Sequence, residues 1–124
     1  MSTHPQIMLI DDDPINNLII RKELTRFNPH IGLIVFESPT EALKYLTQEA
    51  SKPNLILLDI NMPEMNGWEF LDEFEKLSLN INLAMLTSSI AKIDHKKSQD
   101  YSSVKDYFIK PLDKDKIQKI YTLV

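Results

Sequence analysis

Residues 54–67 have the sequence NLILLDINMPEMNG, in which a short apolar run ends at Asp59 and a turn-rich segment containing Pro63 and Gly67 follows. The run has no polar alternation, which is typical of a buried strand in a parallel sheet covered on both faces. Proline and glycine after such a run indicate a loop. This stretch therefore predicts a strand, a loop and then a helix, with a carboxylate at the carboxyl end of the strand.

Similar apolar runs recur along the chain and alternate with segments of helical period. This alternation is typical of repeated strand–helix units that form a mostly parallel sheet. The expected strands are Ile7 to Ile10, Gly32 to Phe36, Asn54 to Leu58, Asn82 to Leu86 and Asp106 to Ile109. The predicted fold class is therefore α/β.

The first two helices are expected to begin at capping residues. Asp13 precedes Pro14, so aspartate would accept bonds from free N–H groups and proline would suit the first turn. Three apolar residues then share one face of this helix: Ile15, Leu18 and Ile19. Residues 38–41, Ser-Pro-Thr-Glu, form a capping box at the start of the second helix.

The third and last helices have the apolar spacing i, i+3, i+4, i+7. The third is expected from Gly67, with Phe70, Leu71 and Phe74 on its apolar face, and the last from Asp113. Asn66-Gly67 also occurs in hairpin turns, but the helical spacing after it favours a helix. A fourth helix between Ser89 and Ser103 has few apolar positions, which predicts low local stability.

Composition limits the classes of protein that this chain can belong to. Its 124 residues are enough for one domain with its own core, so we expect a single domain over residues 1–124. The net charge of -4 argues against direct nucleic-acid binding, and the absence of cysteine excludes disulfides and cysteine-ligated zinc. No stretch is apolar enough to span a bilayer or to act as a signal peptide, so we expect no membrane insertion and a cytoplasmic location.

Polar side chains follow four of the predicted strands at the point where each strand ends. In an open parallel sheet these positions meet at one edge, where ligands bind. Clustered carboxylates repel one another, and a hard divalent cation such as Mg²⁺ would relieve this repulsion. Asp12 and Asp59 are the expected direct ligands, which would allow the Asp59 carboxylate to attack a phosphoryl group. The residues expected at this phosphoryl-transfer site are Asp11, Asp12, Asp59, Thr87 and Lys110.

The segment Leu57 to Gly67, together with the acidic cluster, Thr87 and Lys110-Pro111, resembles the receiver domain of two-component response regulators over nearly the whole chain. The resemblance implies a doubly wound five-stranded parallel sheet of the flavodoxin-like (βα)5 type, with strand order 2-1-3-4-5. It implies a stand-alone domain similar to chemotaxis regulators. It also assigns roles: Asp59 as phosphoacceptor, Asp11 and Asp12 as the acidic pair, Thr87 as the switch hydroxyl and Lys110 as the catalytic lysine.

Further implications concern the cofactor, the switch and the partners. The resemblance implies Mg²⁺ or Mn²⁺ held by Asp11, Asp12, Asp59 and the main-chain carbonyl of Asn61. Tyr107 would be the switch aromatic, and the Lys110-Pro111 peptide would be cis. The donor would be a phosphohistidine on a sensor histidine kinase or a histidine phosphotransfer protein, and the chain would catalyse only its own phosphorylation and dephosphorylation. Phosphorylation would switch an interaction surface for an unknown protein target, and the chain would be a monomer or weak dimer.

Two departures from the family pattern stand beside this resemblance. Receivers often carry a small Gly-Ala pair before the last strand, whereas this chain has Tyr101-Ser102-Ser103-Val104. Ser88 replaces a common small apolar residue and offers a hydroxyl that competes with Thr87. Tyr107 also has a simpler interpretation, as a half-buried strand aromatic.

Two rival functions fit part of the pattern. A small haloacid-dehalogenase-like phosphatase would use Asp11 in an Asp11-x-Asp13 motif, with Thr87 and Lys110, but it needs a late acidic pair at a strand end, and the candidates Asp113 and Asp115 fall in the final helix. Asp13 is also explained as a helix cap. The second rival is an interaction module that does not depend on phosphorylation, and the complete set of acidic, hydroxyl and lysine residues argues against it.

Overall fold

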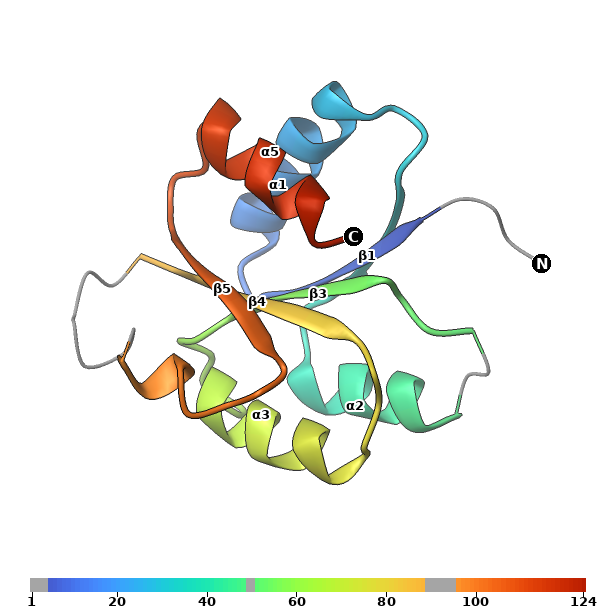
Figure 1. Ribbon diagram of the computed structural model, residues 1–124, viewed down its shortest axis with the longest axis vertical. Coiled ribbons are helices and arrows are strands. Elements are labelled where there is room, and N and C mark those ends of the chain that lie inside the picture. Colours follow the sequence, from blue (N-terminus) through green and yellow to red (C-terminus); the bar gives the residue numbers. More distant parts are fainter. Residues whose placement is uncertain (1–4, 49–50, 89–95) are drawn as a thin grey trace.

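The five strands form one parallel sheet in the order β2-β1-β3-β4-β5 (Figure 1). The computed structural model describes residues 5–48, 51–88 and 96–124. The order confirms the predicted flavodoxin-like topology. The strands are β1 (Gln6–Ile10), β2 (Gly32–Phe36), β3 (Leu55–Asp59), β4 (Asn82–Thr87) and β5 (Val104–Ile109).

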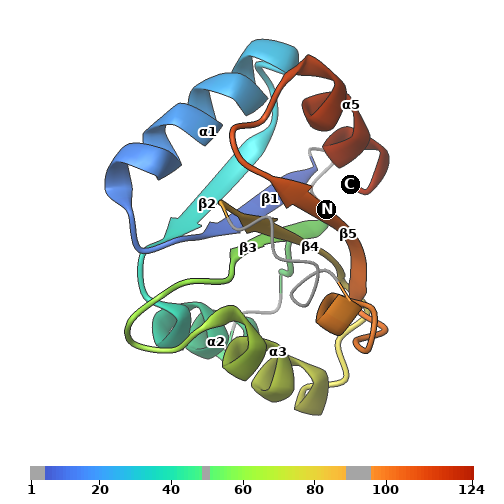
Figure 2. The ribbon, with the colours of Figure 1, turned by 90° about the vertical axis from the view of Figure 1, so that its left-hand side faces the viewer.

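Helices cover both faces of this sheet, as Figures 1 and 2 show. One face carries α1 (Pro14–Phe27) and α5 (Lys114–Thr122), and the other carries α2 (Pro39–Gln48) and α3 (Gly67–Lys76). Within β1, Ile7 and Leu9 pack toward α1 and α5, whereas Met8 and Ile10 pack toward α2 and α3. Because both faces are buried, the central strands β1, β3 and β4 have polar residues only at their ends. Among the described residues, no helix is long and apolar enough to cross a membrane.

Five strand boundaries differ from the sequence-based prediction, four of them by one residue and the start of β5 by two. Asn54 precedes β3, and its side-chain oxygen accepts a hydrogen bond from the N–H of Gln6 at 2.8 Å. The fifth strand begins at Val104, two residues earlier than predicted, because Leu83 pairs with Val104 while Ala84 pairs with Asp106. β5 thus has one extra residue at a bulge in its pairing with β4. The spacing of apolar residues in the sequence does not indicate such a bulge.

The apolar face predicted for α1 is exposed rather than buried. Ile15 is 70% exposed, and Leu18 and Ile19 are each 52% exposed. The core-facing positions are instead Asn17, Ile20 and Leu24. Asn17 fixes this rotation of the helix, because its side-chain amide donates to the main-chain carbonyl of Asp11 at 2.8 Å.

The start of α3 has a capping box that the sequence prediction missed. The Asn66 side chain accepts from the N–H of Glu69 at 2.9 Å, and the Glu69 carboxylate accepts from the N–H of Asn66 at 3.0 Å. Asn66 therefore begins a helix and is not part of a hairpin turn. At α2, the Ser38 hydroxyl accepts from the N–H of Glu41 at 3.2 Å, which is one of the two hydrogen bonds of the predicted capping box.

The predicted fourth helix is described only in part, because residues 89–95 lie outside the described residues. Residues 96–98 form a helical turn that is held against α3. Tyr101 stacks on Trp68 with ring centroids 6.1 Å apart, and its hydroxyl donates to Asp72 at 2.8 Å. Lys97 places its ammonium 5.1 Å from the Trp68 ring. Aromatic and cation–π contacts therefore anchor the end of this segment despite its few aliphatic residues.

Gly67→Ala is expected to destabilise the protein by about 1 to 3 kcal/mol, because α3 begins too close to β3 for a side chain. An added Cβ would lie 2.9 Å from the Cα of Ile60 and 3.0 Å from the carbonyl oxygen of Asp59. These are main-chain atoms, so neither can rotate away. Urea unfolding followed by circular dichroism would measure the loss.

Gly32→Ala is the matched control for this substitution. The nearest atom to its new Cβ would be Cγ of Gln6 at 3.0 Å, which belongs to a flexible side chain. We expect its unfolding free energy to change by less than about 1 kcal/mol. Equal unfolding midpoints for Gly67→Ala and the wild type would contradict the packing argument.

Candidate functional site

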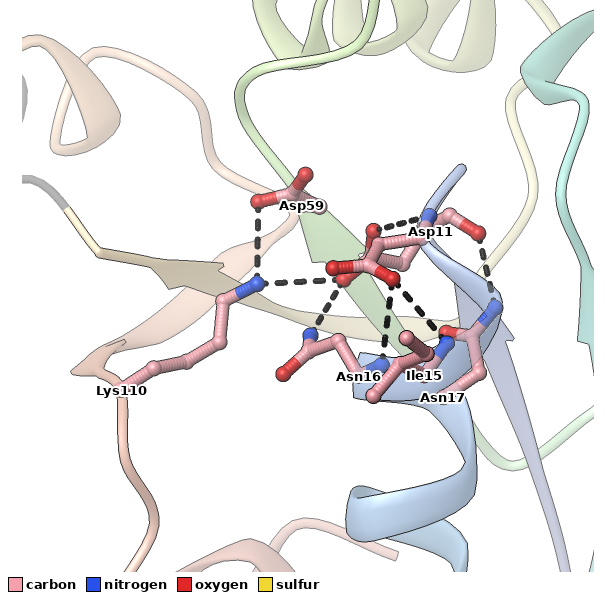
Figure 3. A network of polar contacts seen from close by, with 7 residues as sticks. Asp11, Ile15, Asn16, Asn17, Asp59 and Lys110 are labelled. Carbon is pink, nitrogen blue, oxygen red and sulfur yellow. Dashed lines mark hydrogen bonds and ion pairs between the residues drawn. The ribbon is translucent and has the colours of Figure 1, made fainter.

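The predicted polar residues lie at the carboxyl edge of the sheet. Asp11 directly follows β1, Asp59 is the last residue of β3, and Lys110 directly follows β5. Because β1, β3, β4 and β5 are consecutive neighbours, their ends meet at this edge. Figure 3 shows the Lys110 side chain extending between Asp59 and Asp11.

Lys110 joins two of the carboxylates. Its Nζ lies 3.1 Å from Oδ2 of Asp11 and 3.4 Å from Oδ1 of Asp59. The lysine side chain is 16% exposed, so these ion pairs are screened by water less than surface pairs are. The main-chain N–H of Lys110 donates to the carbonyl of Thr87 at 2.7 Å, and the Lys110-Pro111 peptide is cis, as the resemblance implied.

Asp11, Asp12 and Asp59 form the acidic cluster. Each offers a carboxylate oxygen, and these oxygens lie within 4.8 Å of one another. Desolvation raises the pKa of Asp59 from 3.8 to about 6; Lys110 opposes this rise, whereas the charges of Asp11 and Asp12 add to it. Three hard oxygen donors that repel one another suit a small divalent cation, so the residues fit the predicted metal.

The first turn of α1 supports Asp11 at both carboxylate oxygens. Its Oδ1 accepts from the N–H of Asp13 at 2.9 Å, and its Oδ2 accepts from the side-chain amide of Asn16 at 2.5 Å. Asn16 and Asn17 were not predicted as parts of the site. Their place in the sequence could have indicated them, because the first turn of a helix that follows a strand-end cluster lies beside that cluster.

Asp13 has a different role from its two neighbours. It is exposed and caps α1, since its Oδ1 accepts from the N–H of Ile15 at 3.0 Å and from that of Asn16 at 3.4 Å. Asp113 similarly caps α5 by accepting from the N–H of Lys116 at 2.8 Å. Both residues thus cap helices, although the phosphatase pattern would need Asp13 in its first motif and an acidic pair such as Asp113 and Asp115 at a strand end.

Asn61 lies on the loop between β3 and α3, and its side chain is exposed. This loop is tied to the start of α2 by Glu64, whose carboxylate accepts hydrogen bonds from the hydroxyls of Thr40 and Ser38. These two hydrogen bonds lower the pKa of Glu64. The loop that carries Asn61 is therefore fixed at two points, since the N–H of Gly67 also donates to the carbonyl of Ile60 at 2.8 Å.

The two predicted switch residues lie on neighbouring strands. Thr87 is the last residue of β4 and is fully buried, whereas the competing Ser88 is exposed. Tyr107 lies on β5 opposite Met85 and packs against the core on the side of α2 and α3. Its hydroxyl oxygen is buried.

Comparison with known proteins gives matches along nearly the whole chain. Residues 7–122 match the model of the response regulator receiver domain. The chain is 29% identical over 109 residues to the two-component response regulator ORR13 of Oryza sativa subsp. japonica, covering 87% of this chain and 88% of that protein. It is 33% identical over 107 residues to the sensor histidine kinase CheAY of Helicobacter pylori, covering 85% of this chain but 13% of the kinase.

Two of the similar solved structures are of a phosphorylated and a metal-bound response regulator. The phosphorylated cyanobacterial phytochrome response regulator RcpA is 29% identical, with a TM-score of 0.81, and the match covers 98% of this chain and 91% of that one. The Mn²⁺-bound form of the response regulator Rcp1 is 27% identical, with a TM-score of 0.78, over 96% of this chain and 91% of that one. Both the sequence and the fold of the chain are thus similar to those of response regulators.

Proposed function

Because the chain belongs to the response regulator receiver domain family of two-component signalling, we propose that Asp59 is the residue that accepts the phosphoryl group. The observation that carries the proposal is the position of the Asp59 carboxylate, within 4.8 Å of the acidic pair and 3.4 Å from the Lys110 ammonium. The protein is a signalling receiver domain. Its only catalysis, in this proposal, is its own phosphorylation and dephosphorylation.

The acidic cluster would hold Mg²⁺ or Mn²⁺. Asp11, Asp12 and Asp59 supply carboxylate oxygens, and we assign a fourth ligand to the main-chain carbonyl of Asn61. A bound divalent cation would offset the repulsion between the Asp59 carboxylate and an incoming phosphoryl group. The Mn²⁺-bound state of the related Rcp1 supports this choice of ion.

The phosphoryl donor would be a phosphohistidine on a sensor histidine kinase or a histidine phosphotransfer protein. A carboxylate oxygen of Asp59 attacks phosphorus and forms the new P–O bond. The P–N bond breaks, and its electron pair stays on the imidazole nitrogen of the donor. Lys110 would balance charge on one phosphoryl oxygen, and the Thr87 hydroxyl would donate a hydrogen bond to another.

The exposed face of α1 offers a docking surface for this donor. Ile15, Leu18 and Ile19 are all more than half exposed, and contiguous exposed apolar side chains mark interaction sites. Ile19 also lines a cavity of about 380 Å³ together with Lys110 and Pro111, so the apolar face reaches the phosphorylation site. A donor helix placed on this face would bring its phosphohistidine toward Asp59.

Thr87 and Tyr107 would convert phosphorylation into a change of the interaction surface. A phosphate can act as a switch only if it binds better to one of two accessible conformations. In this proposal the hydroxyl of Thr87 binds the phosphoryl group, and Tyr107 and the neighbouring residues up to Tyr101 adopt the second conformation. An unidentified protein target would then bind that surface.

Phosphorylation of the intact chain by acetyl phosphate tests the proposal. With Mg²⁺ at pH 7.5, the mass of the wild type should rise by one phosphoryl group, and chelation of the metal should prevent the gain. A beryllofluoride complex should bind under the same conditions. A wild type that shows neither effect would rule out the proposed chemistry and favour an interaction module.

Asp12→Ala is expected to weaken Mg²⁺ binding by at least tenfold, whereas Asp13→Ala should change it by less than about twofold. The reason is that Asp12 belongs to the carboxylate cluster, while Asp13 caps α1. Isothermal titration calorimetry of the unphosphorylated protein measures both affinities. Equal losses of affinity for the two variants would show that Asp13 contributes to the cation site as much as Asp12 does.

A further inference from the structure

Asn16 is an uncharged residue with a direct contact to the acidic cluster. Its side-chain amide donates to Oδ2 of Asp11 at 2.5 Å, and the ammonium of Lys110 lies 3.1 Å from the same oxygen. The other oxygen of Asp11 accepts from the N–H of Asp13. The orientation of the Asp11 carboxylate is therefore set by one main-chain donor, one amide and one ammonium, as Figure 3 shows for the side-chain contacts.

The need for this amide follows from the burial of Asp11, whose exposed fraction is 1%. A buried carboxylate is costly unless hydrogen-bond donors satisfy its oxygens. Without Asn16, Lys110 would be the remaining side-chain donor for Oδ2 of Asp11 among the contacts that the structure describes. We would then expect the ammonium to move toward Asp11 and away from Asp59, which now lies 3.4 Å from it.

The helix itself places Asn16 beside Asp11. The cap Asp13 fixes the start of α1, and its Oδ1 also accepts from the N–H of Asn16 at 3.4 Å. Asn16 thus lies in the first turn, half-buried, with its side chain directed back at the strand end from which the helix came. Its short side chain loses little conformational freedom on making this contact.

We propose that Asn16 is a positioning residue for the phosphorylation site. Its amide holds the Asp11 carboxylate in the orientation that completes the divalent-cation site, and it leaves Lys110 free to pair with Asp59 and with the phosphoryl group. The inference rests on the proposed function, because it assumes that the acidic cluster binds a divalent cation. Partners of metal ligands commonly change metal affinity about 10- to 100-fold when they are removed.

The test compares two substitutions in the intact chain. Asn16→Leu keeps nearly the same size and removes the donor, and Asn16→Asp keeps the shape and replaces the donor with a carboxylate. We expect the Kd for Mg²⁺ to rise about tenfold for Asn16→Leu, measured by calorimetry at pH 7.5 without a phosphodonor. Asn16→Asp also loses the donor but adds a negative charge that attracts the cation, so its Kd should rise less than that of Asn16→Leu. Asn16→Gln, which retains an amide donor, should recover part of the affinity.

Thr25→Val is the matched control. It removes a side-chain donor from the same helix, but the Thr25 hydroxyl donates to the main-chain carbonyl of Arg21 and not to the cluster. Its Kd should equal that of the wild type. The inference is overturned if Asn16→Leu binds Mg²⁺ within twofold of the wild type, or if Thr25→Val loses as much affinity. A lower melting temperature of metal-free Asn16→Leu with an unchanged Kd would also overturn it, by showing a structural role only.

The same titration separates this inference from the proposed function. A wild type that binds Mg²⁺ and gains a phosphoryl group, beside an Asn16→Leu variant of equal affinity, refutes the role of Asn16 alone. A wild type that binds no Mg²⁺ refutes both.

Discussion

Asp59→Asn is expected to abolish the mass gain that acetyl phosphate produces in the wild type with Mg²⁺. The amide is nearly isosteric with the carboxylate but lacks the anionic oxygen that attacks phosphorus. It also removes one of the three carboxylates from the cation site. Intact-protein mass spectrometry after incubation at pH 7.5 should therefore show the unmodified mass only.

Asp13→Asn is the control for this loss, because it makes the same chemical change two residues from Asp11 at a helix cap. Asparagine is about as good a cap as aspartate, so the variant should still gain the phosphoryl group. A mass gain that persists in Asp59→Asn would exclude Asp59 as the acceptor. If that variant also hydrolysed a phosphate monoester in a reaction that required Asp11, the dehalogenase-like phosphatase would be the better interpretation.

Asp59→Asn is also expected to stabilise the metal-free protein at neutral pH by about 2 kcal/mol. The folded protein raises the pKa of Asp59 from 3.8 to about 6, so it favours the neutral carboxyl. The part of the unfolding free energy that comes from this preference is fully present below about pH 4 and is lost as the pH rises through about 6. Asparagine carries no charge at any of these pH values, so Asp59→Asn avoids the loss.

Urea unfolding at pH 4 and at pH 7.5, without divalent cations, measures this effect. The two proteins should differ little at pH 4, and Asp59→Asn should be the more stable at pH 7.5. Adding Mg²⁺ should narrow the difference, because the cation binds the folded wild type. Asp115→Asn, an exposed charge removal in the first turn of α5, is the control and should not reproduce the gain. A wild type at least as stable as Asp59→Asn at pH 7.5 would contradict this expectation.

The sequence located the sheet well because the central strands are continuous apolar runs with polar residues only at their ends. The boundaries of β2 agree with the prediction, and those of β1 and β4 differ from it at one end by a single residue. The prediction placed the start of β5 two residues too late, since apolar spacing is insensitive to the bulge opposite Leu83 and Ala84. The strand order came from the family resemblance and not from the apolar pattern.

The face of α1 shows what helical spacing cannot decide. Ile15, Leu18 and Ile19 have the spacing of a buried stripe, yet the buried positions are Asn17, Ile20 and Leu24. Both sets satisfy the period, so periodicity alone does not select between them. The hydrogen bond from Asn17 to the carbonyl of Asp11 selects one, and it joins a helix to the strand before it.

The sequence by itself determined that this protein is a receiver domain and that Asp11, Asp59, Thr87 and Lys110 lie at the carboxyl ends of strands. It could do so because strand ends and helix caps depend on residues close together in the chain. Only the tertiary structure decided that Lys110 lies between Asp11 and Asp59, that Asn16 supports Asp11 and that the apolar face of α1 is exposed. These features depend on distances between side chains from different elements, which are set by how the helices pack on the sheet.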